Sequence, residues 1–191
     1  MATLSIPRGM MRTRYREEKA TQAAARLLAL RGAPMSHLKL IKLLYLVDRE
    51  ALVRLGRPVT HDAYRSMPHG PVLRATLDRI NKPEETPGAY WHKYIGPKQN
   101  QEVRLLSRDV PNDQLSPAEE QLIDDVFQRF GRMTRWELRD YTHTLPEWQD
   151  PRGSSRPIDP ADILRAEGFS DDDIREITAG LEASAIADTL F

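Results

Sequence analysis

The sequence contains no cysteine, which excludes disulfide bonds, thiol catalysis and cysteine-ligated metal sites. It also lacks a long hydrophobic run, since the longest, residues 43–47, is far shorter than the roughly 20 residues of a membrane-spanning helix. The first residues show no hydrophobic stretch of the kind found in secretion signals. We therefore expect a cytoplasmic protein of bacterial or phage type that does not associate with membranes.

An excess of one charge is also missing, because 28 lysines and arginines balance 28 aspartates and glutamates. The two signs are nevertheless separated along the chain. Residues 1–60 hold 12 basic and 4 acidic side chains, whereas residues 111–191 hold 8 and 18. Such asymmetry suits either a nucleic-acid surface at the basic end or docking of the two ends on each other or on a partner protein. The basic residues form no tract with interleaved aromatics, so we favour the protein contacts.

Helix boundaries are well marked in the first half of the chain. Alanines and leucines at helical spacing predict a helix over residues 17–31 that stops at Gly32. Ser36 is placed to cap a second helix that reaches residue 55 and stops at Gly56. Because this second helix is apolar around most of its circumference, we expect it at the centre of the fold. Pro71 favours a further helix over residues 72–80, in whose first turn it would lie.

The second half carries repeated helix-start signals. The pairs Ser116 with Glu119 and Thr134 with Glu137 have the capping-box spacing, which predicts helices over residues 117–130 and 135–143. Two more helix starts, near residues 159 and 170, predict an acidic helical pair within residues 151–191.

The clearest strand pattern lies in residues 90–95 and 103–106, which read as a hairpin around the loop 96–101. Residues 63–67 form a second short extended segment. We therefore predict a mainly α (α+β) fold, a compact domain of six to eight helices with a small β-hairpin or short antiparallel sheet.

Catalytic and metal signatures are also missing. The five histidines do not form the paired-ligand spacing that places two ligands on one helical face. No nucleophile elbow, phosphate loop or dinucleotide fingerprint occurs. We expect no enzyme activity, no metal and no cofactor, with a metal-dependent hydrolase built from Asp48, His61 and His69 as a weaker alternative.

Three other features attract attention as structural or binding elements. Asp48 shares the apolar face of the second helix, so we expect it to accept hydrogen bonds from backbone N–H groups or from an arginine such as Arg74 or Arg79. The rigid segment 67–71 predicts a tight turn or a partner contact. The aromatic side chains should be mostly core, and any exposed one would be an interface anchor; they are Tyr90, Trp91, Tyr94, Trp136, Tyr141 and Trp148.

Residues 38–73 resemble the Panacea domain family, also described as SocA-like antitoxin domains. The residues that carry the resemblance are Leu40, Lys42, Leu43, Tyr45, Asp48, Gly56, Pro58, Val59, Tyr64, Met67, Pro68, His69, Gly70, Pro71 and Val72. Weaker similarity continues through Leu138, Thr142, His143 and Trp148. On this basis we divide the chain into an N-terminal arm at residues 1–14, expected to be flexible, a Panacea-like domain at residues 15–150 and the C-terminal helical pair at residues 151–191.

The resemblance implies an antitoxin that neutralises a cognate toxin, encoded nearby, by direct protein–protein binding. We expect partner contacts from Tyr64, Met67, Pro68, His69, Gly70 and Trp91. The structural motif comprises Leu40, Lys42, Tyr45, Asp48, Gly56, Pro58, Pro71 and Trp148. Two further alternatives stay open: a nucleic-acid-binding regulator that uses the arginines between residues 8 and 16, and an adaptor that delivers a client protein to a protease.

Overall fold

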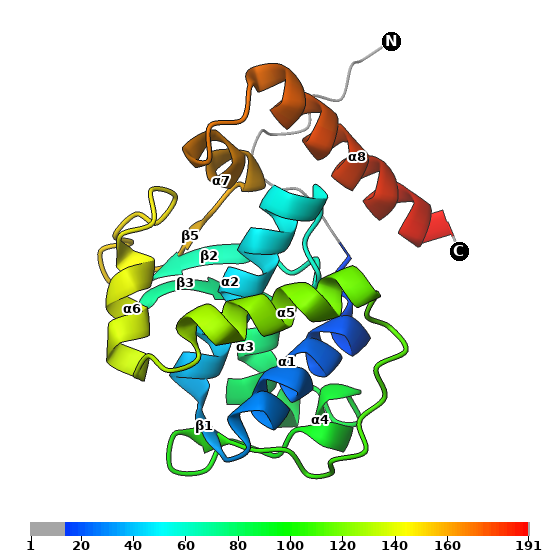
Figure 1. Ribbon diagram of the computed structural model, residues 1–191, viewed down its shortest axis with the longest axis vertical. Helices are drawn as coiled ribbons and strands as arrows, with labels where there is room; N and C mark the ends of the chain where they lie inside the picture. Colours follow the sequence, from blue (N-terminus) through cyan, green and yellow to red (C-terminus); the bar gives the residue numbers. More distant parts are fainter. Residues whose placement is uncertain (1–13, 191) are drawn as a thin grey trace.

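The computed structural model describes residues 14–190, with side chains to residue 187. The predicted N-terminal arm therefore lies outside the described residues, apart from Arg14. Within residues 14–190 the chain forms eight α-helices and two small antiparallel sheets, which confirms the mainly helical fold (Figure 1). The helices are α1 (Glu17–Arg31), α2 (His37–Leu55), α3 (Arg74–Asn81), α4 (Trp91–Tyr94), α5 (Pro117–Phe130), α6 (Arg135–His143), α7 (Pro160–Ala166) and α8 (Asp171–Leu190), and the strands are β1 (Met35–Ser36), β2 (Tyr64–Met67), β3 (Gly70–Leu73), β4 (Glu102–Val103) and β5 (Arg156–Pro157).

Helix α2 is the centre of the molecule, as its sequence predicts. It contacts α1, α3, α5, α6 and α7, and also β1 and β3. Its residues 39–49 are all buried, which removes apolar surface from water on every side of the helix. Helices α1 and α5 pack on α2 and on each other, and α4 packs on α1. Helix α6 lies beyond the C-terminal end of α5 (Figure 1).

The larger sheet has the strand order β3-β2-β5. Strands β2 and β3 form a tight hairpin in which Tyr64 pairs with Leu73 and Met67 pairs with Gly70. The sequence prediction of a helix from residue 72 is therefore wrong at its start: Gly70–Leu73 is a strand, and the helix begins at Arg74. Pro71 fits a strand here because it faces Ser66 at a position where no ladder bond from its nitrogen is needed.

The hairpin predicted over residues 90–106 is wrong in its first strand. Trp91–Tyr94 is the short helix α4, and Glu102–Val103 pairs with β1. The two segments meet at the isolated bridge Ile95–Leu105, where the Gly96 N–H donates to the Arg104 carbonyl and the Leu106 N–H donates to the Tyr94 carbonyl. The aromatic side chains that favour a strand in isolation are used instead to cover α1, because buried tertiary contacts outweigh local propensity.

The predicted helix ends agree with the structure in most places. Gly32 and Gly56 have φ of 68° and 69°, the left-handed conformation that ends α1 and α2. Both capping boxes are formed, at Ser116 and at Thr134. Ser36 does precede α2, but its side chain makes no capping hydrogen bond; the N–H of His37 instead donates to the carbonyl of Gln101, which also ties β1 to the β4 loop.

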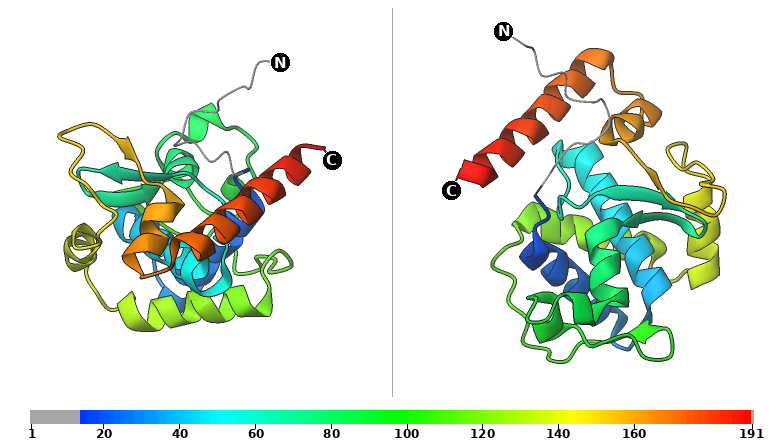
Figure 2. Two further views of the ribbon diagram at one scale, coloured as in Figure 1. Left: turned by 90° about the horizontal axis from the view of Figure 1, so that it is seen from above. Right: turned by 180° about the vertical axis from the view of Figure 1, so that it is seen from behind.

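The C-terminal helices extend the body on the side of the C-terminal end of α2. Helix α7 packs on α2, and α8 runs on from α7 to the C-terminal end of the described chain (Figures 1 and 2). Ile174 and Leu181 face the body and are buried, whereas Ile186 is exposed.

Ion pairs join the basic beginning of the chain to its acidic end. Among the described residues, seven of them connect a basic residue before position 60 with an acidic residue after position 110: Lys19–Glu119, Arg26–Glu120, Arg26–Asp124, Arg49–Glu147, Arg49–Glu167, Arg54–Asp125 and Arg57–Glu119. The charge asymmetry of the sequence is therefore used, at least in these pairs, to dock the two ends of the chain on each other.

Candidate partner-binding site

The family-like motif centres on the β2–β3 hairpin, whose tip is Pro68 and His69. Both tip residues are exposed. The base of the tip is held by the segment after α6: the indole N–H of Trp148 donates to the Met67 carbonyl at 3.1 Å, and the Gln149 N–H donates to the Ser66 hydroxyl at 3.2 Å. The hairpin is thus fixed to the body on one side while its tip faces outward.

Gly70 closes the hairpin at a place where no side chain fits. Its φ is +92°, and a Cβ there would lie 2.7 Å from Oγ1 of Thr142 and 2.9 Å from Nζ of Lys42. Both the backbone conformation and the space exclude other residues at this position. Lys42, Gly70 and Thr142 are far apart in the sequence, but this close approach makes them neighbours in the structure.

Lys42 lies beneath the hairpin with no exposed surface. Its ammonium donates to the Pro71 carbonyl at 2.6 Å. Burial lowers the pKa of Lys42 to about 7, because the charged form loses its hydration there. The lysine therefore anchors β3 to α2 from inside the protein.

His143, at the end of α6, covers the other side of this hairpin. Its ring stacks on Trp148 with centroids 4.1 Å apart and 15° between the planes. Its Nε2 is buried and has no hydrogen-bond partner among the described residues. Burial, helped by the positive charges of Lys42 and Arg139, lowers the pKa of His143, so the neutral ring is favoured in the stack.

The exposed face of α6 carries a large aromatic side chain. Trp136 is 46 % exposed. The guanidinium carbons of Arg135 and Arg139 lie 4.8 and 4.9 Å from its ring centroid, at cation–π distance. Trp136 is thus the exposed member of the aromatic set for which the sequence predicts an interface role.

The residues predicted to contact a partner are distributed between the surface and the interior. Pro68 and His69 are exposed and Met67 is half-buried, whereas Tyr64 and Gly70 are buried in the hairpin. Trp91 is buried on α4, away from the hairpin. The structure therefore brings five of the six predicted residues into one hairpin and leaves Trp91 elsewhere; its role in partner contact stays a prediction, as does that of the others.

Asp48 has the structural role that the sequence predicts for it. It accepts hydrogen bonds from the N–H groups of Val59 and Thr60 and from the Thr60 hydroxyl, at 3.0, 2.9 and 2.5 Å. Burial raises the pKa of Asp48 to about 7, in opposition to these hydrogen bonds. The suggested arginine partners are wrong, because Arg74 pairs with Asp78 and Arg79 pairs with Glu17.

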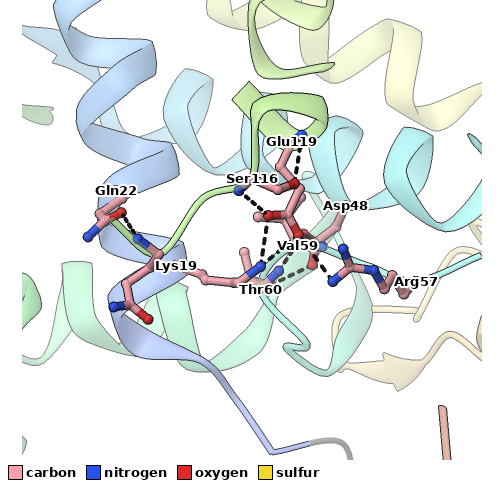
Figure 3. A network of polar contacts seen from close by, with 9 residues as sticks. Lys19, Gln22, Asp48, Arg57, Val59, Thr60, Ser116 and Glu119 are labelled. Carbon is pink, nitrogen blue, oxygen red and sulfur yellow. Dashed lines mark hydrogen bonds and ion pairs between the residues drawn. The ribbon is translucent and has the colours of Figure 1, made fainter. Parts of the chain in front are cut away.

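A second buried carboxylate, Glu119, ties α5 to α1. Its carboxylate accepts from the Lys19 ammonium at 2.7 and 2.8 Å and from the N–H of Ser116 at 2.8 Å. Arg57 lies 3.4 Å away on the same carboxylate. Burial alone would raise the pKa of Glu119, but these hydrogen bonds and charges outweigh it and lower the pKa. Figure 3 shows this network together with that of Asp48.

Two structural residues were missed by the sequence analysis. Asp62 accepts hydrogen bonds from the N–H groups of Ala75 and Thr76 and so caps α3 from a distant position in the chain. Glu147 is buried and accepts from the Tyr45 hydroxyl and from Arg49. No local sequence pattern predicts the role of either residue, although Glu147 directly precedes the predicted motif residue Trp148.

A cleft of about 430 Å³ lies between α8 and the start of α1. Lys19 and Arg57 on its wall are both paired with Glu119, and Ile177 and Leu181 of α8 form its apolar side. Both cations share the single carboxylate of Glu119, and Arg16 and Glu176 also line the cleft.

Neither metal chemistry nor a membrane span is indicated by the described part of the chain. No group of three or more histidine, aspartate or glutamate side chains among residues 14–190 is arranged to hold a metal ion. In particular, Asp48 is committed to Val59 and Thr60, while His69 stands at the exposed hairpin tip. No helix within those residues has the length and apolarity to cross a membrane.

The fold and this site define a mainly helical protein that uses its buried ionisable groups to hold a hairpin and helix α6 in place, with an exposed tryptophan beside them. The chain belongs to the family described as antitoxin SocA-like, Panacea domain, whose model matches residues 40–149. The matched range begins in α2 and ends at the Trp148 segment, so it contains the whole hairpin and α6. No curated protein and no solved structure matches the chain.

Proposed function

We propose that this protein is an antitoxin that neutralises a cognate toxin by direct protein–protein binding in the cytoplasm. Membership of the SocA-like antitoxin family is the observation that carries the proposal. The internal use of the motif's ionisable groups supports it, because Lys42 and Asp48 are buried and bonded to backbone groups. Groups held in this way maintain a shape and are not available to a substrate.

The contact surface that we propose is the hairpin tip together with the exposed face of α6. Pro68 and His69 are held outward by the bonds at the base of the tip, so they can contact a partner without rearrangement. Gly70 and Tyr64 support this tip from below. Rigid, pre-ordered surfaces lose little conformational entropy on binding, which suits tight inhibition of another protein.

Co-expression tests the proposal. The chain should restore growth to cells that express the product of the neighbouring open reading frame, and the two proteins should purify together. A double variant at the tip, P68G/H69A, should weaken rescue, whereas L106A, at an apolar side chain that is 53 % exposed and lies on a different loop, is the matched control. Neighbouring products that are neither toxic nor bound would contradict the proposal.

The same experiment separates neutralisation by binding from delivery to a protease. In simple neutralisation, the toxin level stays constant while growth recovers. If the chain is an adaptor, the toxin half-life falls when the chain is present and recovers when the host protease is removed. The nucleic-acid alternative predicts binding to the upstream DNA that weakens steeply with salt.

A further inference from the structure

The exposed face of α6 combines aromatic and cationic groups in one strip. Residues 136, 140 and 143 are spaced so that they fall on one side of an α-helix, about 10 Å from end to end. Trp136 begins this face and His143, stacked on Trp148, ends it beside the hairpin. We call the face formed by Arg135, Trp136, Arg139, Asp140 and His143 the α6 strip.

The charges of the α6 strip are not equivalent. Arg139 donates to the carboxylate of its neighbour Asp140 at 2.7 Å through Nε. Glu137, on the edge of the strip, accepts from the Thr134 N–H in the capping box at 2.7 Å. Arg135, in contrast, forms no ion pair with a described residue, and its guanidinium lies over the Trp136 ring. The pKa of His37 is lowered mainly by burial, and the positive charges of Lys98 and Arg135 lower it further.

We propose that the α6 strip binds a segment of the partner protein that lays an apolar side chain on Trp136 and a carboxylate on Arg135. This inference rests on the proposed function and names the partner chemistry of the same site. A half-exposed tryptophan flanked by arginines has the composition of a binding hot spot. The partner's carboxylate would pair with the guanidinium of Arg135, which has no acidic partner within the described chain, in the bidentate geometry that arginine favours.

A nucleic acid fits the strip less well than a peptide. Phosphate groups repeat along a strand, so a strand would place negative charge along the whole face. Beyond Trp136 the strip carries the carboxylate of Asp140, which is 63 % exposed, and Glu137 is exposed beside it. A protein segment can combine one carboxylate with apolar and basic neighbours. It can therefore match Arg135 and Trp136 at one end of the strip and the carboxylate of Asp140 further along it.

The test uses the full chain and the co-purified product of the neighbouring open reading frame. W136A should weaken the complex by about 30-fold, the effect of losing a hot-spot residue. R135E should weaken it by a similar factor, and substitution of one partner carboxylate by lysine should restore binding to R135E alone. L30A, at another exposed apolar side chain, is the matched control and should bind like the wild type. Both α6 variants are at the surface, so an unchanged thermal midpoint verifies that the fold is intact.

Tryptophan fluorescence gives a second readout. Trp91 is buried and Trp148 is stacked on His143, so Trp136 should supply most of the emission that acrylamide quenches. Complex formation should protect this emission, and the protection should disappear in W136F, which retains an apolar ring. If the complex forms with wild-type affinity in W136A and R135E, the inference is wrong while the proposed function stands.

If the neighbouring product is not bound at all, the proposed function fails, and the strip is tested separately with random peptides displayed on phage. Selection on the wild-type chain should enrich sequences that pair an apolar residue with a nearby acidic one, and W136A should not retain them. Enrichment of unrelated sequences would overturn the inference. So would W136A-sensitive binding of a random single-stranded oligonucleotide that falls steeply with salt, because it would assign the strip to nucleic acid.

Discussion

Lys42 and Asp48 show how single buried side chains determine the path of the chain around α2. Lys42 holds the Pro71 carbonyl of β3, and Asp48 holds the N–H groups of Val59 and Thr60 in the turn after the helix. A buried polar group without a partner costs about 1–3 kcal/mol, so each bond also selects against other arrangements of these segments. The buried motif residues therefore act first on the fold, and on any partner only through it.

The lowered pKa of Lys42 predicts a distinctive pH dependence of stability. Between pH 7 and 10.5 the unfolded chain binds a proton at Lys42 that the folded protein does not, so the free energy of unfolding should rise with pH in this interval. The rise attributable to Lys42 should reach up to about 1 kcal/mol per pH unit and should be absent in K42M. Urea unfolding of both proteins across this range measures it.

K93M, at an exposed lysine, is the control for the Lys42 prediction. It should follow the wild-type pH profile. Parallel profiles for the wild type and K42M would show that Lys42 is protonated in the folded state and would contradict the prediction.

Gly70 predicts a second residue-scale effect. G70A should lower the free energy of unfolding by about 3 kcal/mol, because alanine is strained at positive φ and its Cβ would collide with Thr142 and Lys42. G88A is the matched control: Gly88 has φ +78°, yet a Cβ there meets nothing within 4 Å. It should cost only about 1 kcal/mol. Chemical denaturation compares the two, and equal losses would exclude the close approach beneath the hairpin.

At the scale of elements, α5 and α6 begin with the same capping box in different surroundings. Glu119 and Glu137 occupy equivalent positions in the two boxes. Glu119 has a side chain that is 1 % exposed and is paired with Lys19, whereas Glu137 is exposed. The first box therefore also attaches α5 to α1, and the second only starts a helix.

Conversion of each glutamate to glutamine should separate these two roles. E119Q should lower the free energy of unfolding by about 3 kcal/mol, because it leaves the partly buried Lys19 ammonium without the buried carboxylate that it contacts. E137Q should cost less than about 1 kcal/mol, since glutamine also serves in a capping box. Denaturant midpoints at constant slope measure both. At pH values below the ordinary pKa of glutamate the E119Q difference should shrink, because the lowered pKa of Glu119 contributes stability only while the group is ionised.

The longer helices could be predicted from the sequence, whereas the short helix α4 and most of the strands could not, for a physical reason. Gly32, Gly56 and the two capping boxes act within a few residues, so their effect is visible locally. Strand β1 pairs with β4, and β2 pairs with β5 on one side, and both of these partners lie far away in the chain. Only the β2–β3 pairing is local. Pro71 favours a helix start when its neighbours alone are considered, and only the pairing of β3 with β2 shows that it lies in a strand.

At the scale of the whole molecule, the separated charges of the sequence connect its two ends. Arg49 of α2 contacts Glu147 at 2.8 Å and Glu167 at 2.7 Å, and so joins the Trp148 segment and the end of α7 to the central helix. Glu147 is fully buried on its side-chain atoms and also accepts from the Tyr45 hydroxyl. This link is the most enclosed of the ion pairs between the ends.

R49M should therefore lower the free energy of unfolding by about 3 kcal/mol, because it leaves the Glu147 carboxylate buried without its cation. R54M is the matched control on the same helix: Arg54 pairs with Asp125, and their side chains are 49 % and 39 % exposed, so it should cost less than about 1 kcal/mol. Thermal or urea unfolding compares them. Equal, small losses would show that the link from α2 to the C-terminal helices contributes little.

The candidate site could be predicted in part. In the sequence, only the family resemblance connects the motif residues of the hairpin with Thr142 and His143. The structure then places these two residues beside Gly70 of the hairpin. The exposure of Trp136 and the burial of Trp91 could not be deduced, because helical spacing does not show which face another element will cover. Arg135 and Arg139 gain interest only once that exposed ring is known.

The bonds from Trp148 and Gln149 to the base of the hairpin tip also bear on how fast a complex would form. A loop that is already in shape need not be ordered during an encounter, so the association rate would be set by diffusion and orientation alone. Variation in binding strength among related chains would then appear almost entirely as differences in how long the two proteins stay together.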